Sequence, residues 1–161
     1  MEPSCTPCPP RYALVGFSSH KGDLISRIIS WATFGKYSHM VIISPCGNWF
    51  IEATGKSEPR GVRAPQSIFE FINKPGATIR QIKHNNPEDL WAAALSQVGK
   101  AYDWGWMLGW VLRIRRIQNT DKWSCAELFG WAAAQAGDPI LFGDYVWRVT
   151  PNDWYLISKP I

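Results

Sequence analysis

Apolar residues in much of the first half of the chain form short runs bounded by turn residues, a pattern typical of β-strands. Residues 39–43 and 49–53 are two such runs, and residues 45–48 between them have turn chemistry. We therefore expect a β-hairpin over residues 39–53. Further strands are predicted at residues 12–17, 61–63 and 77–83, and a helical turn or short helix at 67–72.

Apolar residues spaced three and four positions apart predict the longer helices. The first begins near Asp23 and ends at Gly35. In the second half, Asn86 as N-cap and Pro87 at the first helical position predict a helix that ends near Gly99. Two more helices are predicted over residues 103–115 and 124–136, and a final strand or short helix at 154–157.

These elements predict an α+β domain in which a small antiparallel sheet packs on helices. The length of 161 residues suits one domain, expected over residues 12–161, and residues 1–11 hold four prolines and should form an extended arm. No uninterrupted apolar run reaches the ~18 residues of a spanning helix. No secretory signal is visible in the first residues, so we expect a protein that is cytoplasmic at synthesis.

The composition is that of a globular protein, with 46% hydrophobic and 19% charged residues. A formal net charge of +4 suits an anionic surface, but we expect no nucleic-acid partner. Ten tryptophans are unusual, and three lie in the predicted helix 103–115 before a cluster of arginines. This segment can form core, a docking surface or a membrane-interface contact. The residues are Trp104, Trp106, Trp110, Arg113, Arg115 and Arg116.

Cys5 and Cys8 have the spacing of metal ligands or a redox pair, but no second pair follows them. A zinc site normally has four ligands, so the two form at best half a site, and we expect no metal and no cofactor. The alternatives are two cysteines in a proline-rich arm, or a site shared with a neighbouring chain to which the arm is anchored. Without an export signal, the thiols should be reduced at synthesis.

Cys125 has surroundings that indicate chemistry. It lies in the first turn of the predicted helix 124–136, where unpaired N–H groups and the helix dipole favour an anion. A thiolate is such an anion, so the nucleophilicity of Cys125 at neutral pH should rise. Its own N–H would point toward an oxyanion formed on attack. The alternative is a small buried hydrophobic residue.

A cysteine nucleophile needs a base, and the base needs a residue that orients it. His39 opens the first strand of the hairpin and Glu52 lies near the end of the second. If the two side chains share a face of the sheet, Glu52 can accept a hydrogen bond from His39 and stabilise the imidazolium. His20 and His84 are rival bases in polar, loop-like segments. Asp103 is a rival third member, or the N-cap of the tryptophan-rich helix.

Four blocks in this order resemble the circularly permuted NlpC-type papain-like fold, and specifically its YiiX-like branch. The resemblance covers about residues 12–158, and the histidine precedes the cysteine, the reverse of papain. The blocks are Tyr37-Ser38-His39-Met40-Val41-Ile42; Ile51-Glu52-Ala53 with Gly61-Val62; Gly99-Lys100-Ala101-Tyr102-Asp103; and Trp123-Ser124-Cys125-Ala126-Glu127-Leu128.

The resemblance implies a cysteine amidase or endopeptidase with Cys125 as nucleophile, His39 as base and Glu52 as orienting residue. It places Tyr102 and Asp103 near the cleft, and we expect both, with Ser124, to contact the substrate or the oxyanion. The family's usual substrates are peptide-like amides of the cell wall, so the expected substrate is peptidoglycan. A phage tail or lysis component, associated with the virion, would reach the wall without a signal of its own.

Two other functions stay open. One is a non-catalytic docking or structural module on the same fold, with the tryptophan-rich segment as its docking face. The other is a lipid acyl hydrolase or transferase. The lecithin:retinol acyltransferase-like relatives share the permuted order but typically carry a second histidine and an Asn-Cys-Glu motif, whereas this chain has Glu52 and Ser124-Cys125-Ala126.

Overall fold

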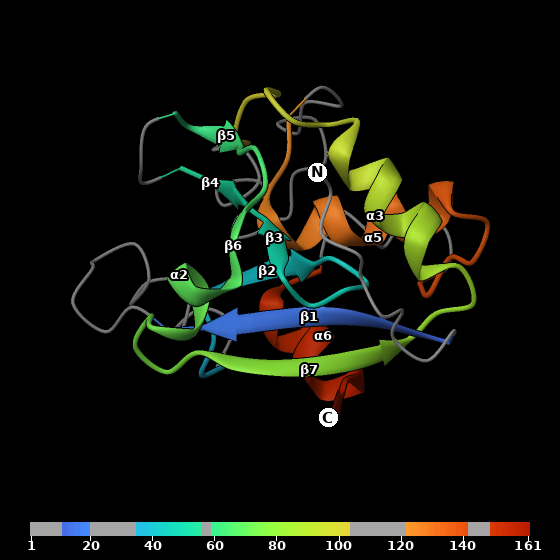
Figure 1. The fold of residues 1–161 in the computed structure, drawn as a ribbon, viewed down its shortest axis with the longest axis horizontal. Coiled ribbons are helices and arrows are strands. Elements are labelled where there is room, and N and C mark those ends of the chain that lie inside the picture. Colours follow the sequence, from blue (N-terminus) through green and yellow to red (C-terminus); the bar gives the residue numbers. More distant parts are fainter. Residues whose placement is uncertain (1–10, 20–34, 56–58, 104–121, 142–148) are drawn as a thin grey trace.

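The computed structural model describes residues 11–19, 35–55, 59–103, 122–141 and 149–161. In these ranges an antiparallel six-stranded sheet with the order β6-β3-β2-β1-β7-β8 is combined with helices (Figure 1). Its strands are β1 (Tyr12–Ser18), β2 (His39–Ile43), β3 (Trp49–Ile51), β6 (Gln66–Ser67), β7 (Thr78–Lys83) and β8 (Lys159–Pro160). Strands β4 (Ala53–Thr54) and β5 (Gly61–Val62) pair separately. The helices are α2 (Ile68–Ile72), α3 (Pro87–Leu95), α5 (Cys125–Gln135) and α6 (Pro151–Ile157).

This architecture confirms the α+β class and the predicted hairpin. Ile42 of β2 pairs with Ile51 of β3, and Gly47 in the connecting turn adopts a φ of 74°, which glycine tolerates without strain. The sheet is larger than the hairpin alone, because β1 lies between β2 and β7 and pairs with both along its length. The sequence pattern predicts these strands but not which of them pair.

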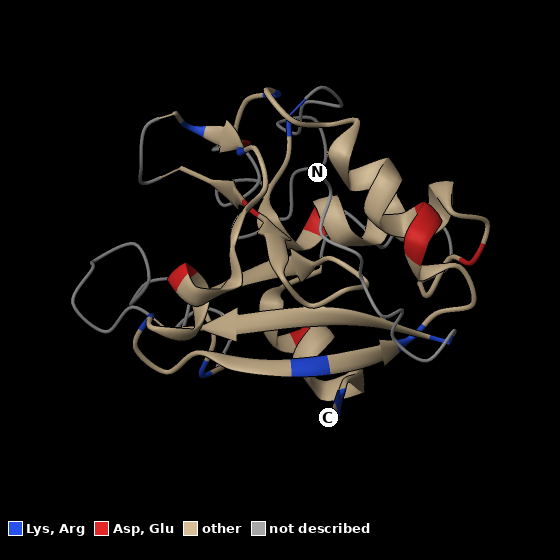
Figure 2. Cartoon of the chain, in the orientation of Figure 1, with Lys and Arg blue, Asp and Glu red and all other residues tan. Residues whose placement is uncertain are grey.

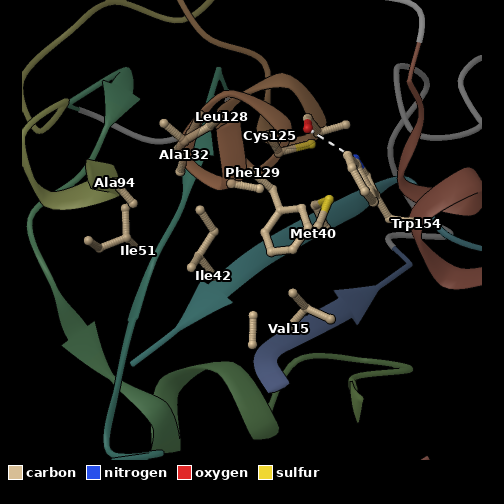
Figure 3. Close-up of a cluster of buried hydrophobic side chains, with 14 of the residues drawn as sticks. Val15, Met40, Ile42, Ile51, Ala94, Cys125, Leu128, Phe129, Ala132 and Trp154 are labelled. Atoms are coloured by element: carbon tan, nitrogen blue, oxygen red, sulfur yellow. Dashed lines mark hydrogen bonds between the residues drawn. The ribbon is translucent and has the colours of Figure 1, made fainter. Parts of the chain in front are cut away.

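The two faces of the sheet contribute to two separate cores, as the alternation of side chains along a strand requires. Met40 and Ile42 belong to the larger core, which α3, α5 and α6 complete, whereas Val41 and Ile43 face Phe71 of α2. Figure 3 shows part of the larger core, with residues of α5 packed over β1 and β2 and with Cys125 near Trp154 at its edge.

Gly16 allows α2 to pack closely on its face of the sheet. It pairs with Val41 across the β1–β2 ladder. A Cβ atom at this position would lie 2.4 Å from the ring of Phe71, which is itself fully buried. Glycine is therefore needed here for close approach.

The helix ends are stabilised by local electrostatics. Each described helix carries an acidic residue in its first turn, where the N-terminal end of the helix dipole favours negative charge (Figure 2). Helix α5 ends before Gly137, with φ 77°, close to its predicted end. No helix in the described ranges is long and apolar enough to cross a bilayer.

Several expectations need correction or fall outside the described residues. Asn86 is the N-cap residue of α3 and Pro87 its first residue, as predicted, but the Asn86 side chain does not cap the helix. Its amide donates to the Ala136 carbonyl and so ties the start of α3 to the end of α5. Of the two alternatives for residues 154–157, the short helix is confirmed: they belong to α6, which begins earlier than expected, at Pro151 after the N-cap Thr150. The arm up to residue 10, the helix expected from Asp23 to residue 34 and the tryptophan-rich segment 104–116 lie outside the described residues.

Candidate active site

His39 and Glu52 are in direct contact. The Nε2 atom of His39 lies 2.7 Å from Oε2 of Glu52, so the ring donates a hydrogen bond to the carboxylate. The register explains the contact: continuing the pairing of Ile42 with Ile51 would place residue 52 opposite residue 41. Residues 39 and 41 share a face of β2, so both side chains lie on one side of the hairpin. The sequence left open whether the His39 and Glu52 side chains share a face of the sheet, and the structure shows that they do.

Glu52 is a buried carboxylate that, among the described residues, is held by three basic side chains. Its side chain is 3% exposed. Besides His39, Arg63 donates to Oε1 at 3.2 Å and Lys74 donates to Oε2 at 3.0 Å. Burial alone would raise the pKa of Glu52, but the hydrogen bond and charge of His39, together with Lys74, hold the pKa of this carboxyl far below its usual range. Glu52 is therefore ionised at all pH values at which the protein would act.

Cys125 is the first residue of α5, and a capping box fixes this helix end. The Ser124 hydroxyl accepts from the Glu127 N–H, and the Glu127 carboxyl accepts from the Ser124 N–H. The cap occupies the N–H of the third residue and leaves the N–H groups of Cys125 and Ala126 without a helical carbonyl partner. The Cys125 side chain thus lies beside amide N–H groups that have no partner within the helix, at the positive end of the helix dipole.

The Cys125 thiol lies close enough to the His39 ring to act on its pKa. Because Nε2 of His39 faces Glu52, the ring nitrogen left for the thiol is Nδ1. Burial of the ring disfavours its charged form, but the hydrogen bonds to Cys125 and Glu52 and their negative charges outweigh this and raise the pKa of His39 from 6.5 to about 9. The three predicted side chains therefore lie together: the imidazole is hydrogen-bonded to the Glu52 carboxylate, and the Cys125 thiol is near enough to influence the imidazole.

Tyr102 lies near the same thiol. Its segment runs beside Trp123, and the next residue, Asp103, donates its N–H to the Trp123 carbonyl at 3.1 Å. Burial and the charges of Cys125, Glu127 and Asp103 raise the pKa of Tyr102. The phenol therefore stays protonated and able to donate a hydrogen bond.

Asp103 and Glu127 are two further buried carboxyl side chains, and the charges of both act on Tyr102. Asp103 is 3% exposed. Burial and the charge of Asp103 raise the pKa of Glu127 to about 7, although its bonds with Ser124 act in the opposite direction. Sequence reasoning missed Glu127, even though a serine followed three residues later by a glutamate signals a capping box.

The rival candidates have other placements. His84 is fully buried, and both ring nitrogens have partners. Nδ1 accepts the N–H of Asn86 in the turn before α3, and Nε2 lies 3.4 Å from the carbonyl oxygen of Ala133 in α5. His20, Cys5 and Cys8 lie outside the described residues. The Ser124 hydroxyl is fully buried and occupied in the helix cap, which makes it a residue that positions Cys125. Within the described ranges, no group of three His, Cys, Asp or Glu side chains could hold a metal ion.

No protein-family model matches the chain, and no curated protein sequence matches it. The chemistry of the site is therefore argued from its own geometry and from the motifs quoted above. This geometry can transfer a proton between a thiol and an imidazole bonded to a carboxylate, beside the amide N–H groups of the first turn of α5.

Proposed function

We propose that this protein is a papain-like cysteine hydrolase that cleaves a peptide-like amide bond through Cys125, His39 and Glu52. The observation that carries the proposal is the hydrogen bond of His39 to the buried Glu52, next to a Cys125 thiol that begins α5 and acts on the His39 ring. A buried structural cysteine has no need of a charged histidine, and a buried glutamate could pair with Arg63 and Lys74 alone. The arrangement is the one that nucleophilic catalysis requires.

In the proposed acylation step, His39 holds the proton that has left the Cys125 thiol, and the thiolate sulfur attacks the amide carbonyl carbon. The carbonyl electron pair moves to oxygen, where the Cys125 N–H and the Tyr102 hydroxyl donate hydrogen bonds to the oxyanion. The tetrahedral intermediate collapses, the C–N bond breaks, and His39 protonates the departing amine. The products of this step are a free amine and a thioester on Cys125.

Water completes the cycle in the proposed deacylation step. His39, now neutral, removes a proton from a water molecule, which attacks the thioester carbonyl. The C–S bond breaks, the carboxylic acid is released, and Cys125 is regenerated as a thiolate beside a protonated His39. Glu52 keeps the ring oriented and stabilises its positive charge through both steps.

The substrate class follows from the resemblance to the permuted NlpC-type fold. Peptide amides of the cell wall are the first expectation, and a phage tail or lysis component is a setting in which such an enzyme would act. A lipid acyl hydrolase or transferase would use the same thioester chemistry, and a docking module would not use it. The substrate must therefore be identified by turnover.

The test is a substrate panel applied to the wild-type chain and to the Cys125→Ser variant, which is nearly isosteric at the nucleophile. Muropeptides, a phospholipid and a small thioester would be incubated with each, and products would be followed by mass spectrometry. Release of an amine from muropeptides by the wild type alone supports the proposal. Turnover of the phospholipid alone favours the lipid function. No turnover together with ordinary thiol reactivity of Cys125 favours the docking module.

A further inference from the structure

Glu52 binds two cations besides His39, and they come from different parts of the fold. Arg63 follows β5 and reaches Oε1, whereas Lys74 follows α2 and reaches Oε2. A carboxylate that only had to orient one histidine would not need either of them. Their arrangement around Glu52 therefore needs a physical explanation of its own.

Both cations are built into the structure and are not loose surface groups. The Nζ atom of Lys74 lies 5.2 Å from the ring centre of Phe50 and 5.8 Å from that of Phe71, and both rings are fully buried. Arg63 is fixed by its main chain, because its N–H donates to the Glu52 carbonyl at 3.0 Å. The Arg63 side chain is only 26% exposed and the Lys74 side chain only 24%.

Lys74 and His39 compete for one oxygen. Nζ of Lys74 and Nε2 of His39 lie 3.0 and 2.7 Å from the same Oε2 atom, so the two nitrogens are at most about 6 Å apart. A cation at this distance disfavours a second positive charge. Lys74 thus supports the charge of Glu52 and opposes the charge of His39.

We propose that Lys74 and Arg63 are positioning residues that hold Glu52 ionised and fixed while limiting how strongly Glu52 retains a proton on His39. How strongly His39 retains its proton matters for turnover, and this step of the inference rests on the proposed function. His39 must give its proton to the leaving amine and then accept one from water. If Glu52 interacted with His39 alone, the proton affinity of His39 would be higher. The ring would then stay protonated and could not act as the base in deacylation.

The charged groups that face His39 can be named element by element. Cys125 approaches from the start of α5, and Glu52 approaches from the link between β3 and β4, with Arg63 and Lys74 behind it. On β1 the paired residue is Ser18, which carries no charge. In the part of the chain that the structure describes, Lys74 and Arg63 are thus groups whose removal changes the electrostatics of the His39–Glu52 pair without altering either member.

The experiment is an NMR titration of the chain carrying ¹³C-labelled histidine rings, with the His39 signal assigned from its loss in His39→Asn. In the wild type His39 should titrate near its raised pKa of about 9. In Lys74→Met the midpoint should rise by about one pH unit, because a repelling cation is lost. Lys74→Arg should restore the wild-type midpoint. In Arg63→Met a smaller rise is expected, since Arg63 binds the other oxygen.

The outcomes separate this inference from the proposed function. A wild-type midpoint near about 9 with an unchanged or lowered midpoint in Lys74→Met overturns the inference alone. A wild-type midpoint near 6.5 overturns the His39–Glu52–Cys125 chain, and both proposals fall with it. If circular dichroism shows that Lys74→Met does not fold, Arg63→Met decides the question, because its main-chain bond to Glu52 is retained.

Discussion

Raising the pH from 6 to 10 should remove about 3 kcal/mol of folding free energy that His39 contributes at the lower pH. The contribution comes from the hydrogen bonds and charges of Cys125 and Glu52, which raise the pKa of His39 from 6.5 to about 9 in the folded chain. The His39 side chain is 17% exposed, so solvent screens these interactions only in part.

The direction of the effect follows from proton linkage. The folded state binds the His39 proton more tightly than the unfolded chain does, where the pKa is the ordinary one. The stabilisation is therefore complete below pH 6.5 and is lost as the pH rises through about 9. The magnitude follows from the separation of the two pKa values, at about 1.4 kcal/mol for each pH unit.

Urea unfolding of the wild type and His39→Asn at a series of pH values measures this term. Tyrosines and lysines also titrate in alkali, but they do so in both proteins, and the difference between the two free energies of unfolding cancels them. The difference should be largest at pH 6 and nearly vanish at pH 10. A difference that does not depend on pH would refute the claim that His39 is held in its charged form.

Four substitutions test other parts of the structure. Glu52→Gln should lower the His39 pKa toward its ordinary value and slow alkylation of Cys125 at pH 7 by about tenfold, which pH-dependent alkylation measures; an unchanged rate would mean that Glu52 does not support the charge of His39. Gly16→Ala should cost about 1–3 kcal/mol in urea unfolding, because the new Cβ meets the Phe71 ring at 2.4 Å, and Phe71→Leu in the same chain should recover part of the loss. Ser124→Ala should lower the free energy of unfolding by about 1 kcal/mol through loss of the helix cap, whereas Ser124→Thr should keep most of the stability that the cap contributes. Tyr102→Phe should lower kcat on the identified substrate by on the order of 100-fold and leave Cys125 alkylation unchanged; equal losses in both would point to a structural role.

The sequence predicts the site where local patterns determine structure. The β-strand runs on either side of a four-residue turn place His39 and Glu52 on neighbouring strands, and the start of α5 is visible at Ser124 and Cys125. Whether the histidine and glutamate share a face depends on register, which the pairing of Ile42 with Ile51 establishes only in three dimensions.

Other features depend on contacts between distant parts of the chain, and no local pattern contains them. Arg63 and Lys74 reach Glu52 from beyond β5 and α2, so nothing in the sequence near Glu52 indicates them. The pairing of β1 with β7 joins segments about 65 residues apart, as in the contact of Val15 with Arg80. Asn86 has the signature of a helix cap, but the proximity of Ala136 gives its side chain a different partner.

The most direct measurement is the rate at which iodoacetamide alkylates Cys125 from pH 5 to 10, determined by peptide mapping in the wild type and in His39→Ala. Cys46, which is half-buried beside Ser44 and is not part of the site, serves as an internal control. Cys125 should react rapidly at pH values well below 8, and His39→Ala should abolish this enhancement. Slow alkylation of Cys125 that rises only near pH ~8.5, as for an ordinary thiol, and that does not change in His39→Ala would contradict a catalytic Cys125–His39–Glu52 unit.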